Sequence, residues 1–106
     1  MKEPLYLSGP MTGIPDFNFP AFHAAAAHLR AQGYTVINPA EFGEADGLAW
    51  SDYLRKDIRA LMDCATIVLL PGWGASKGAR LEEHIARELG MAVLTLDEVP
   101  VLKVAA

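Results

Sequence analysis

Residues 66–70 form a short, almost wholly apolar run, Thr-Ile-Val-Leu-Leu, between two segments with helical periodicity. A strand that is apolar on both faces is typical of the centre of a parallel sheet, because helices cover both of its sides. Similar runs occur at residues 5–7, 34–37 and 92–96, and residues 99–104 could add a short edge piece. The alternation with helical segments predicts a three-layer α/β/α fold: a doubly wound, mainly parallel sheet of four to five strands, Rossmann-like or flavodoxin-like.

Three segments between these runs have the spacing of amphipathic helices. The first begins at Pro20, a residue suited to the first helical position, with Asn18 as a possible cap, and it ends at Gly33. The second begins after residues 51–52, and the third covers residues 77–89. Helices of this kind connect parallel strands and cover the sheet on both faces.

The composition excludes several classes of protein. With 106 residues, 52% of them hydrophobic, and a net charge of −4, the chain is expected to fold as one domain spanning residues 1–106. Its only cysteine, Cys64, excludes a disulfide scaffold and suits a reducing cytoplasm. No apolar stretch approaches the ~20 residues of a membrane span, and residues 1–4 lack a signal-peptide pattern. Without a Lys/Arg cluster, we expect no nucleic acid polymer as a partner.

In doubly wound sheets, ligands bind beyond the carboxyl ends of the strands. The loops that matter here are therefore residues 8–19, 38–49 and 71–78. Trp73 and Tyr53 could stack on a base in this region, although aromatic residues at the rim or in the core would give the same pattern. The topology thus predicts the place of a ligand but not its chemistry.

The glycine-rich turn at residues 71–78, Pro-Gly-Trp-Gly-Ala-Ser-Lys-Gly, lacks the Gly-Lys-Ser/Thr of a Walker phosphate loop. It also departs from the dinucleotide fingerprint, because Gly78 follows Gly74 by four residues instead of three. Ser76 and Gly78 still offer hydrogen-bond donors for an anion at a helix N-terminus, although an ordinary serine-capped turn would look the same. The histidines and Cys64 show no ligand-like spacing, so we expect no metal.

Glu82 lies on the inward stripe of the third predicted helix, which also contains Gly78, Ile85 and Leu89. A carboxylate that faces a ligand crevice can act as nucleophile, general base or hydroxyl-binding group, or it can form a structural ion pair. Asp57 borders the apolar face of the second helix and leaves a similar choice. It could protonate a leaving group in a two-carboxylate mechanism, or it could belong to a surface salt network.

Four segments resemble a known family: Tyr-Leu-Ser-Gly-Pro-Met-Thr-Gly at residues 6–13, Asp-Phe-Asn-Phe-Pro at 16–20, residues 50–57, and Leu-Pro-Gly-Trp at 70–73. They are similar to a small group of bacterial and phage proteins, catalogued as a domain of unknown function within the nucleoside 2-deoxyribosyltransferase-like superfamily. The resemblance covers roughly residues 5–96. It implies a Rossmann-like fold and cleavage of an N-glycosidic bond.

The resemblance also implies roles for individual residues. Glu82, four residues after Gly78, matches the nucleophile of the superfamily, and Tyr6 matches the tyrosine that orients it. Asp57 matches an aspartate that contacts base or sugar, and Ser76 matches a phosphate-holding serine of the branch that cleaves deoxynucleoside 5′-monophosphates. The expected substrate contacts are Ser8, Gly9, Pro10, Met11, Asp16, Asn18, Trp73, Ser76 and Gly78.

The implied reaction is attack of Glu82 on C1′ of a 2′-deoxyribosyl group, in a deoxynucleoside or its 5′-monophosphate. Water would resolve the covalent intermediate in a hydrolase, and an incoming base would do so in a transferase. Related transferases carry an aspartate near Ser76, which favours hydrolysis, while Ala65 replaces an aspartate common in related sequences. The resemblance implies that the reaction needs no metal or redox cofactor. It also implies that the protein assembles as a homodimer or a larger homo-oligomer. The alternative is a non-catalytic nucleotide-binding or sensing domain of the same fold.

Overall fold

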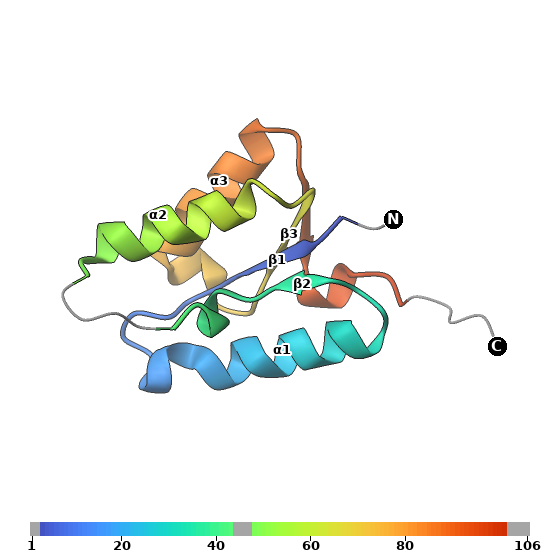
Figure 1. Ribbon diagram of the computed structural model, residues 1–106, viewed down its shortest axis with the longest axis horizontal. Coiled ribbons are helices and arrows are strands. Elements are labelled where there is room, and N and C mark those ends of the chain that lie inside the picture. The colour runs from blue at the N-terminus through green and yellow to red at the C-terminus, as the bar shows by residue number, and fades with distance from the viewer. Residues whose placement is uncertain (1–2, 44–47, 102–106) are drawn as a thin grey trace.

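The computed structural model describes residues 3–43 and 48–101, and these residues form a layered α/β fold (Figure 1). Its strands make one parallel sheet in the order β2-β1-β3-β4. The strands are β1 (Leu5–Ser8), β2 (Val36–Ile37), β3 (Thr66–Leu69) and β4 (Ala92–Thr95). The helices are α1 (Phe19–Ala31), α2 (Trp50–Leu61) and α3 (Lys77–Glu88). The predicted doubly wound parallel α/β class is therefore confirmed.

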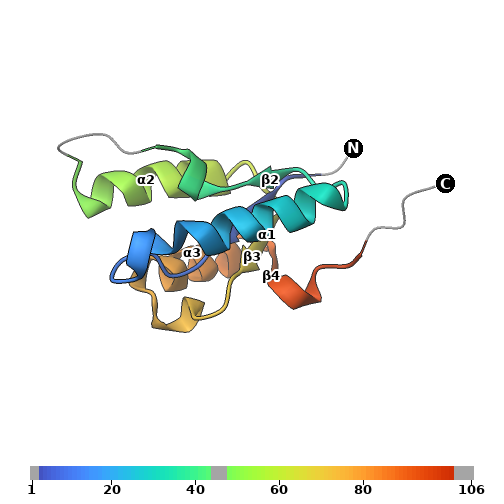
Figure 2. The ribbon, with the colours of Figure 1, turned by 90° about the horizontal axis from the view of Figure 1, so that it is seen from below.

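The sheet separates two hydrophobic cores. Helix α1 covers one face of the sheet, and α2 and α3 cover the other (Figures 1 and 2). Side chains of a strand alternate between the two faces, so Leu5 and Leu7 of β1 pack with α1, whereas Tyr6 lies between the sheet and α2 and α3. By the same alternation Ser8, the last residue of β1, faces the side of Tyr6.

The strand order reverses between β1 and β3. After β1 the chain passes to α1 on one face, and after β3 it passes to α3 on the other. The two loops diverge at the carboxyl ends of these strands, which leaves a crevice at the topological switch point. The loops expected to bind a ligand, residues 8–19 and 71–78, begin at this switch point.

Four local predictions were wrong. The second helix was expected to begin after residues 51–52, but α2 begins at Trp50, and Asp52 lies inside its first turn, where its carboxylate accepts from the Ala49 N–H at 2.9 Å. The strand expected at residues 34–37 is only Val36–Ile37. Asn18 is left-handed (φ +61°) and makes no side-chain cap, because Asp16, Phe17 and Asn18 together form a left-handed turn. No strand forms at residues 99–101, since the chain leaves β4 through a 3₁₀ turn, Leu96–Glu98. The rest of that expected piece, residues 102–104, lies outside the described residues.

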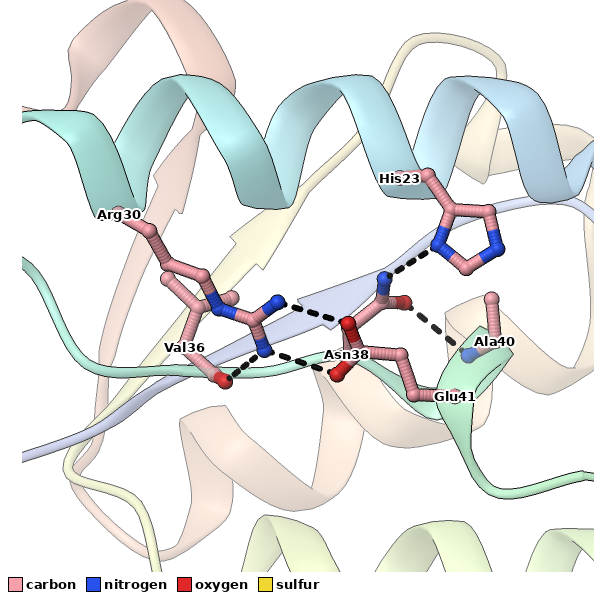
Figure 3. Close-up of polar contacts among 6 residues, drawn as sticks. All are labelled: His23, Arg30, Val36, Asn38, Ala40 and Glu41. Carbon is pink, nitrogen blue, oxygen red and sulfur yellow. Dashed lines mark hydrogen bonds and ion pairs between the residues drawn. The ribbon is translucent and has the colours of Figure 1, made fainter.

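Polar contacts fix the carboxyl end of β2 against α1 (Figure 3). The Arg30 guanidinium donates to both carboxylate oxygens of Glu41, at 2.7 and 2.8 Å. The buried Asn38 accepts from the Ala40 N–H at 3.0 Å, and its amide nitrogen lies 3.2 Å from His23 Nδ1. Because the ion pair is about two-fifths exposed, its main effect is to fix geometry, since surface pairs add little stability.

We expect Gly9→Ala to lower the free energy of unfolding by about 1–3 kcal/mol, the usual cost of overpacking. A Cβ at Gly9 would lie 2.9 Å from the Cβ of Leu70, so the ends of β1 and β3 would have to separate. Gly74→Ala is the matched control, because no atom lies within 4 Å of its added Cβ. Denaturant unfolding of both variants checks this, and equal stabilities would contradict it.

Candidate active site

Glu82 is a buried carboxylate that is held by two hydroxyl groups. It lies on α3, and only 5% of the residue is exposed. The Tyr6 hydroxyl donates to Glu82 Oε2 at 2.9 Å, and the Ser8 hydroxyl donates to Oε1 at 2.6 Å. The ion pairs found among residues 3–43 and 48–101 do not include Glu82. The structure therefore gives Glu82 hydroxyl partners in place of the cation that a structural ion pair requires.

Small residues on α3 bring Glu82 close to β1. Ala79, Glu82 and Ala86 are the buried residues of this helix, and both alanines allow the helix backbone to approach the sheet. Ser76 caps the helix by accepting from the Ala79 N–H at 3.2 Å, which is the serine-capped turn that the sequence left open as the alternative to an anion site. The predicted inward stripe was correct for Glu82 but wrong for Leu89, which is 60% exposed at the helix end.

Burial dominates the acid–base properties of this site. It raises the pKa of Glu82 to about 7, against the two hydrogen bonds, which favour the ionised form. Burial also raises the pKa of Asp57 to about 6, although the neighbouring Lys56 opposes this shift. The pKa of Tyr6 is raised well above its usual value by burial and by the Glu82 charge, so its phenol remains a donor. Two carboxyl groups thus titrate close to neutral pH.

Glu82 and Asp57 both line a cavity of about 1140 Å³ at the carboxyl ends of β1 and β3. Residues from all three predicted loops line it, together with residues of α2 and α3. Its aromatic lining consists of Tyr6, Phe17, Phe19, Phe22, Phe42, Trp50 and Tyr53. Lys56 and Lys77 also line it, and the Lys77 ammonium lies 5.0 Å from the Trp50 ring centroid. The cavity can accept an aromatic molecule that also carries polar or anionic groups.

Most of the residues proposed from the sequence meet at this cavity. Those that line it are Tyr6, Ser8, Gly9, Pro10, Met11, Asn18, Asp57, Ser76, Gly78 and Glu82. Asp16 and Trp73 are not part of its lining. Asp16 is exposed, and Trp73 packs against the core on the α2 and α3 side of the sheet. Tyr53, the other residue expected to stack on a base, does line the cavity, as do Phe17 and Trp50.

Sequence reasoning missed the contact between Ser8 and Glu82. The sequence assigned the backbone of Ser8 to the 5′ group of the substrate and gave its hydroxyl no role, whereas in the structure this hydroxyl donates to the carboxylate. The contact could have been predicted, because the resemblance implied that Tyr6 orients Glu82. Ser8 follows Tyr6 by two positions, and residues i and i+2 of a strand lie on the same face. Lys77 was also missed, although it is adjacent to Ser76, one of the expected substrate contacts.

The part of the chain that the structure describes was searched for metal sites and for membrane-spanning helices. No group of three or more His, Cys, Asp or Glu side chains there is arranged to hold a metal ion. None of the helices there has the length and apolar character needed to cross a membrane.

Fold and site together define a small parallel α/β protein with a buried carboxylate at its topological switch point. Residues 3–95 match the family described as "Domain of unknown function (DUF4406)", and the chain belongs to this family. The sequence matches none of the curated proteins.

Two solved structures similar to this chain are 2-deoxyribosyltransferases. The enzyme from Leishmania mexicana has a TM-score of 0.68 and 18% sequence identity, covering 88% of this chain and 63% of its own. The enzyme from the psychrotolerant bacterium Bacillus psychrosaccharolyticus has the same TM-score and identity, covering 87% of this chain and 70% of its own. At this identity the similarity establishes a shared fold, and the chain spans less than two thirds of the Leishmania enzyme.

Proposed function

We propose that the protein cleaves the N-glycosidic bond of 2′-deoxynucleosides or their 5′-monophosphates, by hydrolysis or by deoxyribosyl transfer. One observation carries the proposal: Glu82 is buried, is held by two hydroxyls, faces a cavity lined by aromatic residues, and takes part in none of the ion pairs found among the residues that the structure describes. Burying a carboxylate in this way is unfavourable, and perturbed carboxylates are common in active sites. The fold shared with 2-deoxyribosyltransferases supports the same reading.

In this mechanism the Glu82 carboxylate attacks C1′ of the sugar. A C1′–O bond forms as the C1′–N bond breaks, and the electrons of the broken bond leave with the base, which takes up a proton. Water then attacks C1′, the C1′–O bond to Glu82 breaks and the carboxylate is regenerated, and the proton that this water loses replaces the one taken up by the base. In a transferase the nitrogen of a second base attacks in place of water and loses its proton in the same way. Tyr6 remains protonated throughout and orients Glu82.

Asp57 is assigned to the leaving base. Burial raises the pKa of Asp57 to about 6, so much of this carboxyl group is ionised near neutral pH. An ionised Asp57 is better suited to hold a water molecule that protonates the base than to donate its own proton. The 5′ group is placed at the start of α3, where Ser76, Gly78 and Lys77 line the cavity.

The test is incubation of the protein with a panel of deoxynucleosides and their 5′-monophosphates, with free base followed by chromatography. We expect release of base from at least one member of the panel. A second panel with an acceptor base added separates transfer from hydrolysis. Binding of a nucleotide without release of its base would favour the alternative, a nucleotide-sensing domain. If the protein neither binds a member of the panel nor releases base from it, both hypotheses are wrong.

A further inference from the structure

We propose that Ser8 is a positioning residue for Glu82: its hydroxyl, together with that of Tyr6, fixes both carboxylate oxygens and favours the ionised form that attacks the sugar. The inference rests on the proposed function for its catalytic meaning. The hydrogen bonds themselves, and their effect on Glu82, can be measured without turnover.

The two hydrogen bonds divide the carboxylate between them. Ser8 binds Oε1 at 2.6 Å, within the range of short charge-assisted O–H···O⁻ bonds, and Tyr6 binds Oε2 at 2.9 Å. Within the described part of the chain each oxygen has its own hydroxyl donor, so rotation of the carboxylate about its terminal bond would break both bonds. Ser8 is only 1% exposed, so bulk water has little access to replace its hydroxyl.

The backbone beneath Ser8 is fixed by the sheet. The Ser8 carbonyl accepts from the Leu70 N–H at 2.8 Å, and Ser8 pairs with Leu69 in the β1–β3 ladder. Gly9 follows in such close contact with Leu70 that it has no room for a Cβ. Ser8 therefore presents its hydroxyl from a rigid strand to a carboxylate on a separate helix, and this suits a residue that positions another.

The groups around Glu82 act on it in opposite directions. From β1, the Ser8 and Tyr6 hydroxyls favour the ionised carboxylate and lower its pKa, with Ser8 having the larger effect. From α2, the charge of Asp57 raises the pKa, and burial raises it most. Serine does not titrate and the pKa of Tyr6 is well above its usual value, so both donors persist across the pH range of activity.

The experiment is a carboxyl-carbon NMR titration of protein labelled with ¹³C-glutamate, with the Glu82 signal assigned by its loss in Glu82→Gln. In Ser8→Ala we expect the titration midpoint of Glu82 to rise by about 1–2 pH units, the equivalent of one hydrogen bond to a charged group. Ser8→Thr retains the hydroxyl and should restore the midpoint. Ser51→Ala is the control, because it removes an exposed serine hydroxyl at the start of α2.

An unchanged midpoint in folded Ser8→Ala overturns the inference, and amide dispersion in the same sample establishes the fold. If Ser8→Ala does not fold, Ser8→Cys provides the comparison, because its weaker donor in a similar volume should raise the midpoint as well. In active protein, the rising limb of kcat/KM against pH should shift with the midpoint. A shifted midpoint without base release from any substrate refutes the proposed function alone, and base release with an unshifted midpoint refutes the role of Ser8 alone.

Discussion

Glu82→Gln is expected to lower kcat/KM for base release by at least about 10³-fold, as removal of a nucleophile does. Glutamine has nearly the same shape, and its amide can accept from one hydroxyl and donate to the other, so the fold should persist. It cannot form the ester with C1′, because an amide oxygen is a weak nucleophile. Measured rates of base release, with the best substrate of the panel, check the effect.

The matched control is Glu88→Gln, the same substitution on the exposed end of α3, which should retain full activity. Glu82→Ala with added azide distinguishes a nucleophile from a general base as the role of the carboxylate. If Glu82 is the nucleophile, azide can attack C1′ in its place and yield a deoxyribosyl azide. Full activity of Glu82→Gln would remove the residue from the mechanism.

Periodicity was sufficient to predict that Glu82 is buried, and the reason is geometric. On a helix that begins at a known turn, the direction of a side chain depends only on its distance from the start, so the inward carboxylate could be read from the sequence. Tyr6 was implied by the family resemblance, and the structure places it 2.9 Å from Glu82, although 76 positions separate them. Because β1 and β3 are neighbours in the parallel sheet, Tyr6 on β1 lies close to α3, the helix that follows β3.

The parts that could not be predicted depend on backbone conformations set by tertiary contacts. Asn18 is of a residue type that often caps helices, but it lies in a left-handed turn of three residues and its side chain makes no cap. Trp73 is in a glycine-rich turn, where local sequence leaves its direction open, and it packs into the core rather than the cavity. Trp50 is the first residue of α2 and lines the cavity. The sequence placed the start of this helix later, after residues 51–52.

The same burial that prepares Glu82 for chemistry should make the protein less stable as the pH rises. Burial raises the pKa of Glu82 from 4.5 to about 7, so between these values the folded protein keeps a proton that the unfolded chain releases. The contribution of Glu82 is therefore fully present below about pH 4.5, decreases as the pH rises, and is lost above about pH 7. A shift of this size corresponds to about 3 kcal/mol.

We therefore expect Glu82→Gln to be more stable than the wild type above about pH 7, by up to about 3 kcal/mol, with the advantage disappearing toward about pH 4.5. Denaturant unfolding of both proteins over this range measures the difference, in which the effects of unrelated carboxylates cancel. Glu41→Gln is the opposing control, because the hydrogen bonds from Arg30 lower the pKa of Glu41, and its replacement should cost a little stability, as expected for a surface pair. If Glu82→Gln were less stable than the wild type at pH 8, Glu82 would be a structural residue. A gain in stability together with a loss of activity is what a carboxylate kept for catalysis predicts, because its burial is then a cost that only the reaction justifies.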